Sequence, residues 1–207
     1  MNEIKITYDS KYFLRLYSIL MADDIVKSIN NNIEYLKNII PEIEPMIGFD
    51  QKNPDHHLDV WNHTLLALSL SKKNFDIRLI LLLHDISKPT CNIEVDGVRH
   101  YPNHGVMSGK IAYEVLKRLN FKEDYINEIC YYIINHDFKM DDEFINNNLF
   151  ETQILYQVQS CDALAHNPEK LENRKKYLAE IKNKLYCITN NQSLETVEKP
   201  AEYFKSV

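Results

Sequence analysis

Apolar residues recur along most of the chain with the spacing of a helix that buries one face. In residues 13–20, 111–119, 154–162 and 171–181, apolar side chains return about every third or fourth position. Besides an N-terminal helical region, the pattern predicts helices near 58–71, 76–88, 104–119, 123–137, 150–166 and 168–188. In the helix over 76–88, Asp76 is the expected N-cap and Pro89 the expected stop.

Breaks in the pattern indicate where other structures lie. Residues 41–48 contain two prolines and a glycine, which end the N-terminal helical region. Residues 91–101 alternate in polarity around Asp96-Gly97, a strong short-range signal for a β-hairpin. From Thr189 onward the chain is polar and aperiodic, as expected of a tail.

The chain is predicted to form one domain of the all-α class with a short β-hairpin insertion. It contains only 4 glycines in 207 residues, which is too few for the tight turns of a β-rich fold. No internal repeat and no glycine-rich or serine-rich linker divides the sequence. The single helical domain over 1–207 is expected to comprise an N-terminal helical region at 1–50, a core at 51–166, and a C-terminal helix and tail at 167–207.

Composition and charge narrow the class of protein. A hydrophobic fraction of 44% with only 7 prolines excludes a disordered chain. The apolar runs are far shorter than the ~18 residues that a membrane span needs, and no export signal is evident, so we expect a cytoplasmic protein. A net charge of -6 argues against binding to long nucleic acids. The 4 cysteines are far apart and are expected to be reduced thiols.

The candidate chemistry lies in histidines and aspartates set in apolar surroundings. These residues fall on different predicted helices and are His63, the doublet His84-Asp85, His104, His136 and Asp162. An ionised carboxylate in an apolar stripe is costly to bury unless it is paired, and a metal ion would pair with it. Helical bundles build metal sites from one or two inward ligands per helix. The alternative for the doublet is a buried histidine and aspartate that satisfy each other.

Other charged groups add to this picture. Lys88 lies three residues after Asp85, so its ammonium should cover the same patch and suit an anionic substrate. Asp137 follows His136 and could orient that imidazole. The remaining histidines, His56, His100 and His166, are expected at the surface or in local hydrogen bonds, and Arg99 is expected to form a cross-strand ion pair with Glu94.

The order of these residues resembles the H…HD…D signature of the HD superfamily of metal-dependent phosphohydrolases. His104 and His136 resemble the additional pair of its two-metal members. The sequence is most similar to the HD domain attached to some bacterial tRNA nucleotidyltransferases of the CCA-adding type. The similarity covers about residues 35 to 165 and is carried by Pro41-Glu42, residues 51–57, 59–65 and 82–89, His100-Tyr101, His104, Ser108 and Asp162.

The resemblance implies an HD-domain helical bundle, with residues 51–166 as the HD core, and a role for each candidate. It places one divalent ion (Mn, Fe, Ni, Co, Zn or Mg) on His63, His84, Asp85 and Asp162, with Asp85 bridging to a second ion on His104 and His136. Lys88 and Asp85 would be catalytic, Lys88 would also contact the substrate phosphate, and His57 could touch it at the pocket mouth.

Two features depart from the family pattern. Ser87 stands where the family usually has glycine, a small change that should leave the ligand geometry intact. The nucleotidyltransferase head has no counterpart in this chain, so polymerising activity is not expected.

The sequence leaves more than one function open. The leading hypothesis is hydrolysis of a small phosphoester, such as a nucleotide, a 2′,3′-cyclic phosphate or an RNA end, by a metal-activated water. The alternative is a non-catalytic helical module that binds tRNA or a protein and contains a structural metal. Hydrolysis of a nucleotide second messenger is a third possibility, because no residue pattern reports on base recognition.

Overall fold

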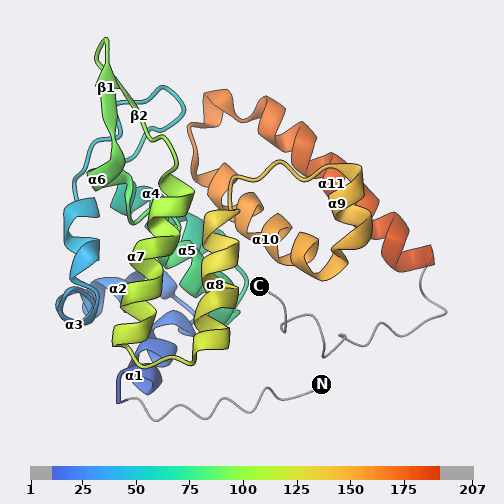
Figure 1. Ribbon diagram of the computed structural model, residues 1–207. Coiled ribbons are helices and arrows are strands. Elements are labelled where there is room, and N and C mark those ends of the chain that lie inside the picture. Colours follow the sequence, from blue (N-terminus) through green and yellow to red (C-terminus); the bar gives the residue numbers. More distant parts are fainter. Residues whose placement is uncertain (1–10, 192–207) are drawn as a thin grey trace.

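The computed structural model describes residues 11–191, and in that range it confirms an all-α fold with a short hairpin (Figure 1). The first half contains α1 (Lys11–Leu20), α2 (Ile25–Asn31), α3 (Ile33–Ile39), the 3-10 helix η1 (Pro41–Met46), α4 (Val60–Leu70), α5 (Phe75–Leu83) and α6 (Lys88–Cys91). After the hairpin of β1 (Ile93–Val95) and β2 (Val98–His100) come α7 (His104–Arg118), α8 (Glu123–Ile134), α9 (Asp142–Asn147), α10 (Leu149–Ala165), the 3-10 helix η2 (Pro168–Lys170) and α11 (Glu172–Asn191). No helix in the described range is both long and apolar enough to cross a bilayer.

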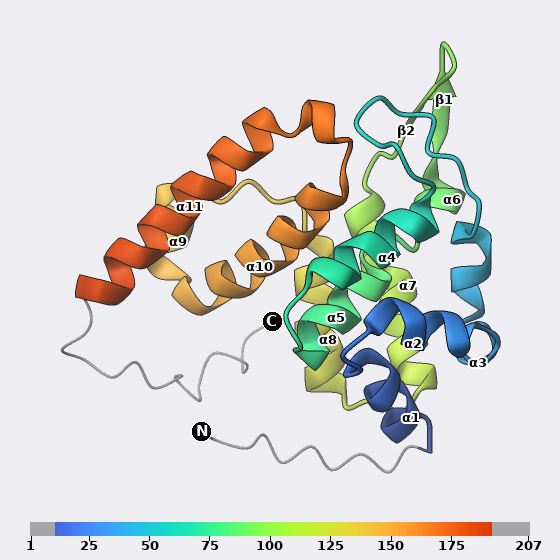
Figure 2. The same cartoon turned by 180° about the vertical axis from the view of Figure 1, so that it is seen from behind.

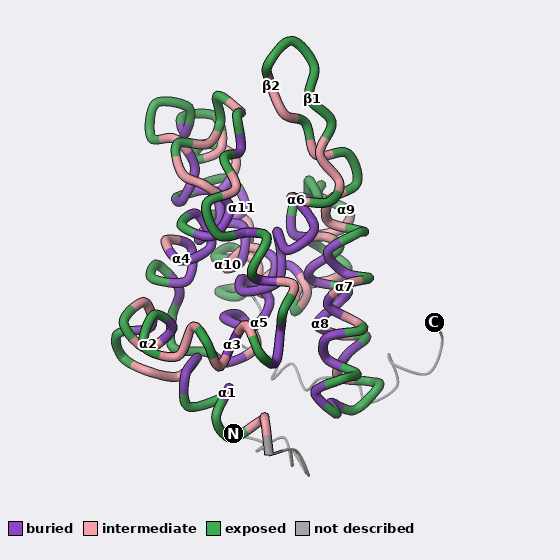
Figure 3. Tube along the Cα trace, turned by 90° about the vertical axis from the view of Figure 1, so that its left-hand side faces the viewer, coloured by how far each residue is buried: buried purple, intermediate pink, exposed green. Residues whose placement is uncertain are grey.

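The core is built around α5, whose residues are all buried except Asp76. Helices α1, α4, α7, α8 and α10 all contact α5, which lies in the middle of the helical body (Figure 2). Each fully buried leucine in this helix contributes roughly 1.5–3 kcal/mol of hydrophobic stabilisation. Figure 3 shows the contrast with the hairpin, which projects from the helical body and is largely exposed. The residues that follow α5, beginning with His84, therefore start from the buried core.

The predicted helix over 76–88 is wrong at both ends. The cap is Asn74, whose side chain accepts a hydrogen bond from the Ile77 amide at 3.0 Å, while Asp76 lies inside the first turn. At the other end α5 stops at Leu83, and Pro89 does not end a helix but lies in the first turn of α6. Proline is tolerated there because first-turn amides lack helical partners anyway. His84 and Asp85 consequently lie in a tight turn between two helices.

Several other helices also begin or end at residues other than those that the periodicity predicts. Helix α8 ends at Ile134, so His136 lies in the loop that follows rather than in the last helical turn. Helix α9 was not predicted, because six residues are too few to show a period; the Asp141 side chain caps it by accepting from the Phe144 amide at 2.8 Å. The last helix begins at Glu172 and continues to Asn191, so the tail predicted from Thr189 does not begin there. The rest of that predicted tail lies outside the described residues.

Helices α7 and α8 pack unusually closely, and two glycines permit it. A Cβ atom added at Gly105 would lie 2.7 Å from the carbonyl oxygen of Ile134, and one added at Gly109 would lie 2.5 Å from the Ile134 Cγ1 atom. Any side chain at these two positions would push the helices apart. The close approach brings the first residue of α7, His104, next to the loop that carries His136.

The hairpin forms as its turn sequence predicts. Asp96 and Gly97 both have positive φ angles of 51° and 79°, which suit the tight turn between twisted strands. Glu94 pairs with Arg99 in the antiparallel register, and the predicted ion pair between them is confirmed at 3.2 Å. The Arg99 amide also donates to the Lys52 carbonyl at 2.9 Å, which fastens the hairpin to the loop before α4.

Candidate metal centre

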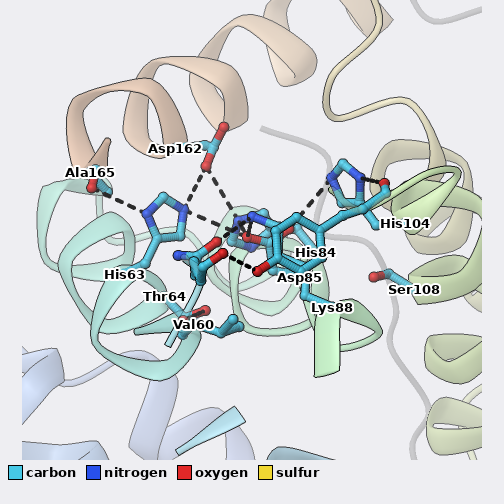
Figure 4. A network of polar contacts seen from close by, with 12 residues as sticks. Val60, His63, Thr64, His84, Asp85, Lys88, His104, Ser108, Asp162 and Ala165 are labelled. Atoms are coloured by element: carbon cyan, nitrogen blue, oxygen red, sulfur yellow. Dashed lines mark hydrogen bonds and ion pairs between the residues drawn. The ribbon is translucent and has the colours of Figure 1, made fainter. Parts of the chain in front are cut away.

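The six residues predicted as metal ligands converge from five segments of the chain, and Figure 4 labels five of them, all but His136. They are His63 on α4, His84 and Asp85 in the turn after α5, His104 at the start of α7, His136 after α8, and Asp162 on α10. Five of them are at most 4% exposed, and only His104 is partly accessible. Residues separated by up to 99 positions in the sequence thus form one buried polar cluster.

A first group combines His63, His84, Asp85 and Asp162. The Nε2 atom of His63 lies 2.8 Å from Asp162 Oδ1 and 3.7 Å from Asp85 Oδ2. The Nε2 atom of His84 lies 3.3 Å from Asp85 Oδ2 and 3.4 Å from Asp162 Oδ1. All four candidate ligand atoms fall within 4.8 Å of one another, so this group could hold a metal ion.

A second group uses the opposite oxygen of Asp85. Its Oδ1 atom lies 3.6 Å from His104 Nε2 and 3.9 Å from His136 Nε2. The two Nε2 atoms are only 3.1 Å apart. Because Oδ2 of Asp85 faces the first group and Oδ1 faces the second, this carboxylate is placed to bridge two ions.

The hydrogen bonds of the four imidazoles fix which ring nitrogen faces each group. Every Nδ1 atom lies near a backbone carbonyl: Ala165 for His63 at 3.2 Å, Leu81 for His84 at 2.7 Å, Tyr101 for His104 at 3.0 Å, and Ile133 for His136 at 2.6 Å. A carbonyl only accepts, so each Nδ1 carries a proton. In its neutral form each ring presents the lone pair of Nε2, the form that binds metals.

The cluster contains buried polar atoms without hydrogen-bond partners. They are Nε2 of His84 and both carboxylate oxygens of Asp85, of which Oδ2 is balanced by an ion pair with the Lys88 ammonium at 2.7 Å. In a dry interior such atoms are costly to leave unpaired. The 3.1 Å approach of the His104 and His136 Nε2 atoms is also unfavourable between two lone pairs, and becomes favourable with a cation or a proton between them. The residues present therefore fit divalent metal ions.

The charges of the two buried carboxylates also favour bound cations. Burial alone would raise the pKa of Asp85, but the nearby charges of His84 and Lys88 outweigh it and hold that pKa well below its usual value. Burial also opposes ionisation of Asp162, and hydrogen bonds from His166, His63 and His84 overcome it, so its pKa is well below the usual value too. Both side chains are anionic at neutral pH, which requires cations beside them.

Lys88 lies where the spacing predicts, beside Asp85. Its Nζ atom is 2.7 Å from Asp85 Oδ2 and 3.0 Å from Oε1 of Gln51, a fully buried amide. The backbone carbonyl of Gln51 in turn accepts from the Tyr101 hydroxyl at 2.7 Å. The ammonium, only 4% exposed, is thus held at the edge of the metal groups by the loop before α4 and the end of β2. Sequence reasoning missed Gln51, which has no spacing signal.

Asp137 does not orient His136 as predicted, and the role of His57 at the pocket mouth stays a prediction. The Oδ2 atom of Asp137 lies 3.2 Å from His104 Nε2 and 3.6 Å from His136 Nε2, on the ligand side of both rings. The carbonyl of Ile133, not Asp137, orients His136 through Nδ1. The side chain of His57 is exposed and belongs to none of the described groups of candidate ligands.

Two histidines that were expected at the surface or in local hydrogen bonds lie against the cluster. His166 is only 5% exposed, and its Nε2 atom is 3.5 Å from Asp162 Oδ2. His56 is half-buried with its ring centroid 5.1 Å from that of His63, and burial, together with the charge of Lys88, lowers its pKa to about 2. The i, i+4 spacing of Asp162 and His166 in the sequence could have predicted the contact between these two side chains.

Comparison with known proteins adds no family to these observations. No protein-family model matches the chain, and no curated protein is significantly similar to it in sequence.

Proposed function

We propose that the protein is a metal-dependent phosphohydrolase that acts on a small phosphoester. The observation that carries the proposal is the sharing of Asp85 between two groups of imidazole nitrogens and carboxylate oxygens. Paired ions bridged by a carboxylate are a recurrent means of hydrolysing phosphoesters. The resemblance to the HD superfamily supports the same reaction, and the mixed nitrogen and oxygen ligands suit Mn, Fe, Co, Ni, Zn or Mg.

The residues around the cluster have complementary tasks. A bound divalent ion supplies a hydroxide near neutral pH and neutralises charge on phosphoryl oxygens. Asp85 would hold both ions, and His63, His84, Asp162, His104 and His136 would complete their ligands. Lys88 contributes a fixed positive charge 2.7 Å from Asp85 for the negative charge that develops on the phosphoryl group.

The exposure of the site limits the substrate to a small group or a chain end. His63, His84 and Asp85 are at most 1% exposed, whereas the side chains of His104 and Asp137 are 18% and 50% exposed. A phosphoester therefore reaches the cluster from the side of the second group. A nucleotide, a 2′,3′-cyclic phosphate, an RNA end and a nucleotide second messenger all fit this access, whereas a long nucleic acid is opposed by the net charge of -6.

A panel of these phosphoesters, assayed with each candidate metal, tests the proposal. We expect hydrolysis of at least one substrate, seen as phosphate release from a monoester or as a new phosphomonoester from a diester, and its loss in Asp85→Ala. The matched control is His100→Ala, which removes an exposed histidine of β2 and should retain activity. Turnover that persists in Asp85→Ala at the level of the unmodified chain would contradict the assignment.

The near-complete burial of the first group favours a second candidate function. A closed metal site is typical of ions that stabilise a fold, so the chain could be a non-catalytic tRNA- or protein-binding module with a structural metal. This candidate predicts tight metal binding and metal-dependent stability without turnover of any phosphoester in the panel.

A further inference from the structure

A third group of imidazoles adjoins the first metal group. Ring nitrogens of His56, His63 and His166 lie within 4.8 Å of one another. The ring centroids are 5.1 Å apart for His56 and His63, 5.2 Å for His63 and His166, and 4.2 Å for His56 and His166. These separations are as short as the 5.7 Å between His63 and His84 in the first group. The third group is therefore as compact as a candidate ligand set.

Backbone contacts hold the two additional histidines in place. His56 lies in the loop before α4, and His166 is the first residue after α10. The Asn167 amide donates to the Asp55 carbonyl at 2.9 Å, and the Asn167 side chain donates to the Pro54 carbonyl at 3.1 Å. The residues next to His56 and His166 are thus joined directly, so both rings are preorganised.

A separate observation indicates that this group lacks a ligand. The Nδ1 atoms of His56 and His166 are both buried and have no hydrogen-bond partner. For His166 the neighbouring carboxylate fixes the tautomer: Asp162 Oδ2 only accepts, so the proton lies on Nε2, which is 3.5 Å away. The buried Nδ1 atom therefore presents a lone pair, as a metal ligand does.

We propose that His56, His63 and His166 form a further position for a transition-metal ion, which competes with the first group for His63. It rests on the first group being a metal site, but not on the hydrolase activity. Three imidazoles without a carboxylate suit Zn, Ni, Co or Cu, whereas the carboxylate-containing first group also suits Mn and Mg. The two positions thus differ in the ions that they select.

The competition follows from the hydrogen bonds of His63. Its Nδ1 atom is occupied by the Ala165 carbonyl at 3.2 Å, so only the Nε2 lone pair is available. One lone pair binds one ion. A nitrogen-preferring ion on His56 and His166 therefore takes His63 away from Asp162, which alters the first group when such an ion is in excess.

The test compares the affinities of the full-length chain for Zn²⁺ and Mn²⁺ by competition with a metal-sensitive dye. His56→Ala should weaken Zn²⁺ binding by about tenfold or more and leave Mn²⁺ binding unchanged, because His56 belongs to the third group alone. His57→Ala is the matched control, since it removes the neighbouring exposed histidine. It should change neither affinity.

A second variant guards against a fold defect. If His56→Ala melts at a lower temperature, His56→Asn keeps a polar side chain in the loop and should show the same selective loss of Zn²⁺ affinity. Unchanged Zn²⁺ affinity in both variants, or an equal loss of Zn²⁺ and Mn²⁺ affinity, would overturn the proposal. Zinc selectivity in a chain that hydrolyses no phosphoester would leave it standing and contradict only the proposed hydrolase.

Discussion

Single protons decide the chemistry of the cluster, and His84 shows this most clearly. Burial alone would lower its pKa, but the charges and hydrogen bonds of Asp85 and Asp162 outweigh burial and raise the pKa to about 10 in the metal-free chain. The proton on Nε2 then occupies the place of a cation between the carboxylates. A metal ion must displace that proton in order to bind.

Metal binding should therefore release a proton at neutral pH. Calorimetric titrations at pH 7.5 in buffers of different ionisation enthalpy should show release of about one proton from His84, and metal affinity should rise with pH until about pH 10. In the metal-free chain the raised pKa stabilises the fold fully below pH ~6.5, and this contribution is lost as the pH rises towards 10. A buffer-independent binding enthalpy would contradict the assignment of this proton.

Substitution of Lys88 distinguishes an effect on turnover from an effect on metal binding. Lys88→Ala removes a charge beside the reacting group without removing a ligand, so both ions should stay bound while turnover falls by about 10²- to 10³-fold. Elemental analysis and initial rates measure the two effects. Lys73→Ala, which removes a lysine that pairs with exposed Asp23, is the control and should keep full activity. Loss of metal and helicity in Lys88→Ala would show that the lysine is structural.

At the scale of elements, two serine hydroxyls join the turn after α5 to the start of α7. Ser87 Oγ donates to the His104 carbonyl at 2.9 Å, and Ser108 Oγ donates to Ser87 Oγ at 2.9 Å. The Ser87 amide donates back to Ser108 Oγ at 3.2 Å. Ser87, which replaces the glycine usual in the resembled family, therefore fastens His104 to the turn that carries Asp85.

This connection predicts a selective effect on the second ion. Ser108→Ala removes the hydroxyl that holds Ser87, so His104 loses part of its support, and the affinity for the second ion should fall about tenfold while that for the first is unchanged. Stepwise metal titration measures both affinities. Ser160→Ala, whose hydroxyl bonds only to the Tyr156 carbonyl within α10, is the matched control. Equal weakening of both ions would contradict a local role.

At the scale of the whole molecule, the cluster links helices that are distant in sequence. An ion in either group ties α4, α7, α8 or α10 to the turn after α5, so metal binding should stabilise the entire fold. At an ion concentration 100 times Kd the gain is about 2.7 kcal/mol, or a rise in Tm of about 5–10 °C for a domain of this size. Thermal melts with and without a chelator measure it, and an unchanged Tm would contradict metal binding by the folded chain.

The sequence predicts the helical class and the convergence of six ligands, because both depend on periodicity and on polar residues in apolar stripes. It does not predict the turn at His84 and Asp85, since a proline in a first helical turn resembles a proline that stops a helix. It also assigns His56 and His166 to the surface or to local hydrogen bonds and not to the cluster, because their position beside the cluster depends on the docking of the Asn167 backbone onto Asp55. Contacts between distant loops leave no periodic trace.

The most direct test of the central claim is a count of bound metal ions. The purified chain, loaded with Mn²⁺ and freed of excess ion, should contain two ions by elemental analysis, because two ligand groups share Asp85. Asp85→Ala should contain almost none while its far-ultraviolet circular dichroism keeps the helical signal. A metal-free wild-type chain, or an Asp85→Ala variant that retains both ions, would contradict the account.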